Sequence, residues 1–170
     1  PAIFEKIAKR YNGKIIRTEI DQDALIRASC HSNVIMAGDG EGHFIFPDFH
    51  CAIDGLMALA KILEFMATQQ VSLGDVVANL PPYYMAERRV SCVWEAKARV
   101  MRLISEKFED HKSPRINGIK IEVHADQWVL IVPDPDQPYF RIITEAESQN
   151  IAETLVDEYA QIVEKISPLE

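Results

Sequence analysis

The sequence has 170 residues, 48% hydrophobic and 26% charged, which is typical of a soluble globular protein that can bury a core. Its net charge of -8 argues against nucleic acid as a partner and, more weakly, against an anionic membrane surface. It has no basic leader and no apolar run of about eighteen residues, so we expect neither a signal peptide nor a membrane span. Its three cysteines form no C-x-x-C pair, which argues against a disulfide framework or zinc site and favours reduced thiols in a cytoplasmic protein.

The first half of the chain alternates between helical and strand patterns. Apolar spacing predicts a helix over residues 2–11, with a turn at residues 12–13 and a strand over residues 14–18. Asp21 is placed to cap a short helix over residues 21–28. Because parallel sheets usually begin on a strand, the leading helix indicates that an upstream strand is missing from this chain.

Two apolar runs, residues 34–36 and 44–46, predict strands on either side of a glycine-rich polar loop. The loop presents Asp39, Glu41 and His43 between glycines. Carboxylates accept hydrogen bonds from hydroxyl groups, so Asp39 and Glu41 suit a sugar, and His43 titrates near neutrality and could move a proton. Two other interpretations stay open: a turn with solvated acids and, with weaker support, a calcium loop, which needs a longer acidic series ending in glutamate.

The segment after this loop ends the first predicted domain. His50, in an irregular connector, is interpreted as a structural histidine. Residues 56–67 are apolar on nearly all sides and predict a helix that is buried on more than one side. Ser72 can cap a further short helix, and the two prolines at residues 81–82 end it, so we place the domain boundary after Leu80.

The second half predicts the order β-α-β-β-β-α, with polar connections at residues 109–114 and 125–127. Its expected elements are a strand at 83–91, a helix at 94–108, strands at 119–124, 128–132 and 139–146, and a final helix capped by Ser148. An antiparallel sheet with two helices on one face is the expected arrangement. The predicted fold class is therefore α/β for residues 1–80 followed by α+β for residues 81–170.

A proline-rich loop joins the last two predicted strands. Residues 133–138 contain three prolines, which make the loop stiff, and two acids, Asp134 and Asp136. The loop contains no basic residue, so it would repel an anion such as phosphate. It is either a shaped binding loop or a rigid turn, and physical chemistry favours the rigid turn.

The chain resembles the C-terminal part of the α-D-phosphohexomutases, the phosphomannomutase and phosphoglucomutase family. Residues 38–43 look like that family's sugar-binding loop, G-E-x-S-G-H, with Gly42 in register. By this resemblance Asp39 takes the place of a glutamate that binds sugar hydroxyls, Glu41 replaces the serine, and His43 matches a histidine that assists proton transfer. The resemblance also implies that Arg17, followed by Thr18, helps to hold the phosphosugar. Further similarity lies at residues 52–55, 117–121 and 128–130.

The resemblance implies a four-domain enzyme that moves a phosphoryl group between the 1- and 6-positions of a hexose phosphate. The phosphoserine loop of the family's first domain and the magnesium loop of its second do not occur here, so we expect no cofactor or metal ligand in this chain and Mg²⁺ in the missing part. Residues 1–80 would be most of the third domain and residues 81–170 the TBP-like fourth domain. The implied partners are a hexose phosphate, such as mannose or glucose phosphate, and the missing N-terminal domains, without which the chain should be inactive.

One departure from the family pattern lies in the second half. The fourth domain of the family binds phosphate with a loop like R-x-S-N-T-E-P. The aligned residues 132–138 lack the arginine, serine and threonine of that loop. Asp134, Asp136 and Gln137 therefore belong to a degenerate phosphate loop. This variant looks like the mutase-like regions fused to nucleotidyltransferases of the mannose-1-phosphate guanylyltransferase type. The alternative function is thus a catalytically degenerate binding, regulatory or assembly module.

Overall fold

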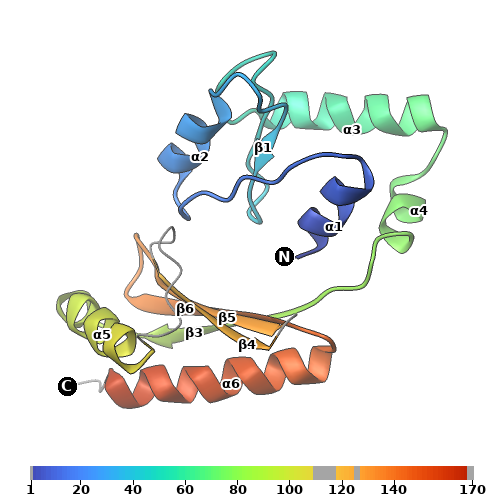
Figure 1. The fold of residues 1–170 in the computed structure, drawn as a ribbon. Helices are drawn as coiled ribbons and strands as arrows, with labels where there is room; N and C mark the ends of the chain where they lie inside the picture. The colour runs from blue at the N-terminus through green and yellow to red at the C-terminus, as the bar shows by residue number, and fades with distance from the viewer. Residues whose placement is uncertain (1, 109–117, 125–126, 168–170) are drawn as a thin grey trace. The chain divides into compact units, whose positions relative to one another are not determined.

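The computed structural model describes residues 2–108, 118–124 and 127–167 (Figure 1). The predicted connections at residues 109–114 and 125–126 lie outside this range, as does Asn117. The chain separates into two compact units, one of residues 17–81 and one of residues 1–16 with 82–170. The division into two domains after Leu80 stays a prediction, and the units are described one at a time.

The larger unit is built on an antiparallel sheet of four strands in the order β3-β6-β5-β4. Each pair of neighbouring strands is antiparallel. Helices α5 and α6 lie on the same face of this sheet (Figure 1). The predicted α+β arrangement is therefore confirmed, and its elements are β3 (Tyr84–Ser91), α5 (Trp94–Lys107), β4 (Ile119–His124), β5 (Gln127–Pro133), β6 (Tyr139–Ala146) and α6 (Gln149–Ile166).

The core of this unit lies between the sheet and the two helices. Alternate residues of a strand point to the same face, so the inward positions of β6 supply Phe140 and Ile142, both fully buried. The helices contribute residues at spacings of three and four, which form one apolar stripe on each helix. These helical core residues are Val100 and Ile104 of α5 and Val156, Ala160 and Val163 of α6.

The opposite face of the sheet carries polar side chains held in pairs. The guanidinium of Arg141 donates two hydrogen bonds to the carboxylate of Glu87, at 3.1 and 3.2 Å. The indole N–H of Trp128 donates to Glu145 at 2.7 Å, and the same buried carboxylate accepts from the backbone N–H of Ala2. Ala2 precedes α1 (Ile3–Arg10), so this contact ties the start of α1 to the sheet.

The smaller unit contains α2 (Gln22–Ser29), β1 (Ala37–Gly38), β2 (Phe44–Ile45), α3 (Gly55–Gln69) and α4 (Leu73–Ala78). Asp21 caps α2 and Ser72 caps α4, as predicted. The prediction of a strand over residues 14–18 is wrong, and the strand predicted at residues 34–36 is replaced by the two-residue β1. Strands need neighbours for their backbone hydrogen bonds, and within the described residues no strand pairs with residues 14–18.

Helix α3 forms where it was predicted, but the prediction that it is buried on more than one side is wrong. Among its described side chains only Ala58 is buried, and Leu56, Leu63 and Phe65 are 82%, 55% and 47% exposed. The two-residue strands β1 and β2 are too small to cover a helix of 15 residues. Despite this apolar surface, no helix in the described ranges is long and apolar enough to cross a membrane.

Candidate functional site

The glycine-rich loop is closed at its base by the pairing of β1 with β2. Ala37 pairs with Ile45 and Gly38 with Phe44, and the N–H of Asp39 donates to the carbonyl of His43 at 3.2 Å. Gly42 has a φ of 92°, a backbone conformation that a residue with a Cβ adopts only under strain. A Cβ on Gly38 would lie 2.9 Å from the ring of Phe44. Two glycines of the motif are thus required by the shape of the loop.

The carboxylate of Asp39 organises the loop from within. One oxygen, Oδ1, accepts the backbone N–H groups of Glu41 and His43 at 2.9 and 3.0 Å. The other oxygen, Oδ2, lies 2.6 Å from Nδ1 of the His43 imidazole. A carboxylate has about four acceptor positions, and three are used inside the loop. The role of Asp39 in binding sugar hydroxyls stays a prediction, but its contacts also make it a positioning residue for His43.

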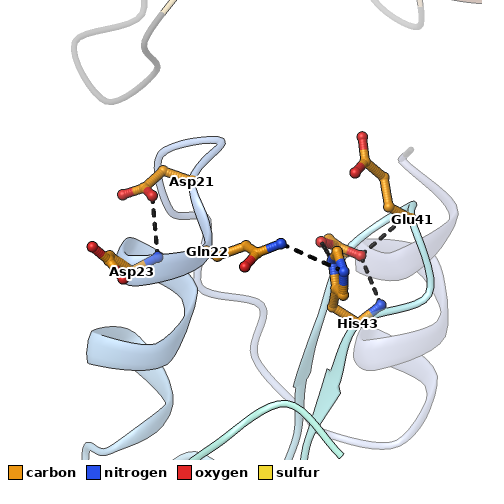
Figure 2. Close-up of polar contacts among 6 residues, drawn as sticks. Asp21, Gln22, Asp23, Glu41 and His43 are labelled. Atoms are coloured by element: carbon orange, nitrogen blue, oxygen red, sulfur yellow. Dashed lines mark hydrogen bonds and ion pairs between the residues drawn. The ribbon is translucent and has the colours of Figure 1, made fainter. Parts of the chain in front are cut away.

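The imidazole of His43 is held from two sides. Because Nδ1 faces the Asp39 carboxylate, that nitrogen carries the proton, and Nε2 of the neutral ring is an acceptor. The side-chain amide nitrogen of Gln22 lies 3.5 Å from Nε2 (Figure 2). Asp21 caps α2 by accepting the N–H groups of Asp23 and Ala24, each at 3.1 Å, and this cap places Gln22 at the first position of the helix.

The sequence did not mark Gln22 as a site residue, because a single glutamine at the start of a helix belongs to no motif. Glu41 lies on the same loop as His43, and Figure 2 shows its side chain extending away from the imidazole. Arg17 is exposed and stands in the irregular segment before α2, next to Thr18. The predicted substrate-binding roles of Arg17, Glu41 and Gly42 stay predictions.

This arrangement has a definite chemical capacity. A carboxylate that holds one imidazole nitrogen fixes the ring orientation and the tautomer, and stabilises the ring when it takes up a proton. The side chain of His43 is 28% exposed, so Nε2 can accept a proton from a hydroxyl group that reaches the loop. The loop could therefore act as a general base toward a polyhydroxylated ligand.

Acidification should loosen this loop. Burial raises the pKa of Asp39, but the hydrogen bonds from the side chain and backbone of His43 and the backbone of Glu41 outweigh it, so its pKa lies below the ordinary value. A lowered folded-state pKa gives stability that is present above about pH 4, the ordinary range for aspartate, and is lost as the pH falls through the folded pKa. A carbon-detected NMR titration of the Asp39 carboxyl, with the His43 amide followed in parallel, measures the pKa of Asp39 in the folded chain. A titration midpoint at or above that of an unfolded aspartate would contradict the lowered pKa.

Comparison with known proteins assigns this loop to a family. Residues 2–84 match phosphoglucomutase/phosphomannomutase, alpha/beta/alpha domain III. The chain is 28% identical over 167 residues to a probable phosphoglucosamine mutase of Methanopyrus kandleri, and 30% identical over 165 residues to a phosphoglucomutase/phosphomannomutase of Thermococcus kodakarensis. The chain belongs to the phosphohexomutase family.

The likeness extends through nearly all of the chain but only part of its relatives. Each of these two alignments covers 96% of this chain and 36% of the phosphohexomutase it matches. A crystal structure of a phosphoglucomutase/phosphomannomutase family protein from Burkholderia thailandensis matches 98% of the chain and 36% of its own, with a TM-score of 0.77 and 17% identity. That structure supports the fold alone. The predicted mixed fold is thus confirmed for this phosphohexomutase segment.

The loop at residues 133–138 of this phosphohexomutase segment is a tight connection between β5 and β6. The N–H of Asp134 donates to the carbonyl of Tyr139 at 3.1 Å, and the N–H of Tyr139 donates to the carbonyl of Gln137 at 2.8 Å. Asp136, by its backbone N–H, donates to Oδ1 of Asp134 at 3.0 Å. Asp134, Asp136 and Gln137, the residues of the predicted degenerate phosphate loop, thus make hydrogen bonds within the turn.

Proposed function

We propose that this chain supplies the sugar-recognition part of a phosphohexomutase, an enzyme that moves a phosphoryl group between the 1- and 6-positions of a hexose phosphate. The observation that carries the proposal is the Asp39–His43 pair on a glycine loop, with Nε2 of His43 presented as a proton acceptor. Family membership and the match of domain III to residues 2–84 support it. Because the chain spans 36% of the matched relatives, phosphoryl transfer belongs to the whole protein.

The proposed roles follow from side-chain chemistry. His43 exchanges a proton with a sugar hydroxyl, and Asp39 holds its ring in place. Glu41 and the backbone of Gly42 contact the sugar, and Arg17 neutralises charge on the phosphate. The described residues include no group of three His, Cys, Asp or Glu side chains that could hold a metal ion, and we propose no metal site in this chain. Phosphoryl transfer depends mainly on positioning and charge neutralisation, so this part alone should not turn over.

The substrate is proposed as a class, hexose phosphates. The names of the relatives divide between phosphoglucosamine mutase and phosphoglucomutase/phosphomannomutase, and their identities to this chain, 28% and 30%, are too similar to favour one hexose. A site built on one histidine and short carboxylates recognises hydroxyl groups in general. Specificity among glucose, mannose and glucosamine phosphates is therefore assigned to contacts beyond this loop.

One observation favours the second candidate function. In the loop at residues 133–138 the N–H groups of Asp134 and Asp136 are used within the turn, and the loop lacks the arginine, serine and threonine of the family's phosphate-binding loop. Loss of these phosphate-binding residues is expected if the region became a binding, regulatory or assembly module, for example one fused to a sugar-1-phosphate nucleotidyltransferase. In that case His43 would have no part in turnover.

Titration of the labelled chain with glucose 1-phosphate and mannose 1-phosphate tests sugar recognition. We expect saturable shifts of the backbone amides at residues 38–43, with a Kd of about 1 mM or weaker, which corresponds to about -4 kcal/mol. Inorganic phosphate should not shift these amide resonances, because the loop itself carries two carboxylates and no arginine or lysine. The same titration of an Asp39→Asn variant is the matched control, since it keeps the size of the side chain and removes the charge that fixes His43.

Weaker binding by Asp39→Asn than by the wild-type chain would support the positioning role of Asp39. If neither sugar phosphate shifts the amide resonances of residues 38–43, the result contradicts sugar recognition by this loop. It then favours the second candidate function, a binding, regulatory or assembly module. Equal shifts with inorganic phosphate and sugar phosphate would also contradict it, because the sugar would then contribute nothing.

A further inference from the structure

The side chain of Gln22 reaches the proton-accepting nitrogen of His43 from a separate element of the fold. Its amide nitrogen lies 3.5 Å from Nε2 of His43, and both residues belong to the same compact unit (Figure 2). Because Nδ1 of His43 faces the Asp39 carboxylate, Nε2 is an acceptor, and the amide NH₂ of Gln22 is the group that suits it. The site therefore presents one acceptor and one donor side by side.

The position of Gln22 is set by the start of α2. Asp21 accepts the backbone N–H groups of Asp23 and Ala24 at 3.1 Å each, which fixes the first turn of the helix. Ala24 is buried, at 8% exposed, so the same turn is anchored in the unit. Gln22 itself is exposed, and the side chain of His43 is 28% exposed. A ligand can thus reach both polar groups, while the helix that carries Gln22 is fixed.

The distance between the two nitrogens allows one bound oxygen to contact both. Hydrogen bonds between nitrogen and oxygen are about 2.7–3.2 Å long. Two nitrogens 3.5 Å apart can each lie about 2.9 Å from a single oxygen, because the three atoms then form a closed triangle. The direct contact between amide and imidazole is long and therefore weak, so little is lost when an oxygen replaces it.

A hydroxyl group is both a donor and an acceptor, and this pair of nitrogens matches both functions. We propose that Gln22 is a substrate-binding residue of the sugar site, whose amide N–H donates to the oxygen of the same hydroxyl that donates its proton to Nε2 of His43. The inference rests on the proposed function and deepens it. It names the group that the site takes, a hydroxyl rather than an ammonium, which has no acceptor.

The proton transfer follows from this placement. The O–H bond breaks, its proton passes to Nε2 of His43, and its electron pair stays on the oxygen. The positive charge of the imidazolium is then balanced by the Asp39 carboxylate beside Nδ1. The amide of Gln22 contacts the oxygen before and during the transfer, so it orients the hydroxyl and contributes uniform binding. Its effect should therefore fall on the affinity for the sugar phosphate more than on kcat.

A Gln22→Met substitution removes the donor and keeps the length and the neutrality of the side chain. The matched control is Gln69→Met, at an exposed glutamine at the end of α3 in the same compact unit. The probe is glucose 1-phosphate, and its Kd is measured from the backbone amides of residues 38–43 in the labelled chain. We expect this Kd to rise about three- to tenfold in Gln22→Met, as for the loss of one hydrogen bond, and to stay unchanged in Gln69→Met.

A second comparison separates a contact with one hydroxyl from a merely structural role. The titrations are repeated with the monodeoxy analogues of glucose 1-phosphate, each of which lacks one hydroxyl group. The analogue that lacks the bound hydroxyl should bind the wild-type and Gln22→Met chains equally, because the donor then has no partner to lose. The other analogues should keep the difference of about three- to tenfold.

Equal Kd values for the wild-type and Gln22→Met chains would overturn this inference and leave the proposed function standing. The same weakening for every deoxy analogue would also overturn it, because Gln22 would then contact no particular hydroxyl. In the wild-type chain the side-chain amide resonances of Gln22 should shift with the Kd of the loop amides, and resonances that do not shift would overturn the inference whatever the variant does. If glucose 1-phosphate shifts no amide of residues 38–43, the proposed function and this inference both fail.

Discussion

A His43→Gln substitution in the intact protein should lower the rate of hexose-phosphate interconversion by about 10²- to 10⁴-fold, the usual contribution of a positioned general acid or base. The physical reason is the geometry of the Asp39–His43 pair, at 2.6 Å, which leaves Nε2 as the proton acceptor. Glutamine keeps a hydrogen-bonding side chain of similar length but cannot take up a proton near neutral pH. The measurement is the steady-state rate with glucose 1-phosphate and mannose 1-phosphate.

The control is a Gln22→Ala variant, which removes the amide 3.5 Å from Nε2 and leaves the Asp39 contact intact. Because a hydrogen bond this long is weak, we expect a loss of less than about tenfold. The isolated chain should show no turnover at all, since it spans only 36% of the length of the phosphohexomutases that it matches. An intact protein whose rate is unchanged by His43→Gln would exclude the catalytic role and support the degenerate module.

If His43 acts as a base, the rate should depend on Asp39 as well. Asp39→Asn keeps an acceptor for the two backbone N–H groups but removes the charge that favours a protonated imidazole. A general base that loses its carboxylate partner loses the contact that fixes its tautomer and ring orientation. A lower kcat at an unchanged KM in this variant would therefore support a positioning role of Asp39, whereas an unchanged kcat would contradict it.

The larger unit was predictable because its signals are local and agree with one another. Residues 119–124 alternate apolar and polar, and Ser148 stands at a capping position before an apolar stripe of helical spacing. The antiparallel order follows from short connections between β5 and β6. In such a sequence, periodicity, caps and turns all favour the same arrangement, which is the condition for a correct prediction.

The smaller unit was predicted less well because its errors concern contacts rather than local preference. The strand expected over residues 14–18 has apolar residues but no described strand beside it, so its backbone forms no ladder. Helix α3 has the composition of a buried helix, yet Leu56 is 82% exposed. Composition states what a segment can bury, and only the presence of a neighbour decides whether it does.

The candidate site was predictable in its residue types but not in its contacts. The glycines and acids of residues 38–43 marked the loop, and Gly42 indeed has the positive φ that glycine permits. The sequence assigned the carboxylate of Asp39 to a ligand, whereas three of its hydrogen bonds stay inside the loop. Gln22 was missed because it is 21 residues from His43 in the chain and meets it only through the packing of α2 beside β1.

A Phe140→Ala substitution should have the largest effect on stability, a loss of about 3–5 kcal/mol, because it removes a fully buried ring and leaves a cavity. Phe140 lies on β6, a strand with a neighbour on each side, among core residues that include Val100 of α5 and Val156 of α6. A domain is stable by about 5–15 kcal/mol, so this single change would remove a large part of the total.

Urea unfolding, followed by the fluorescence of Trp94 and Trp128, measures this loss, since both indoles belong to the same compact unit as Phe140. The matched control is Tyr83→Ala in that unit, because Tyr83 is 48% exposed and its truncation opens no enclosed cavity. We expect the control to lose less than about 1 kcal/mol. Equal losses of unfolding free energy in the two variants would mean that the layer between sheet and helices is not the source of stability. A large loss confined to Phe140→Ala would show that this layer stabilises the sheet. The same layer then supports the loop at residues 133–138, since Phe140 pairs with Val90 on one side and with Pro133, the first residue of the loop, on the other.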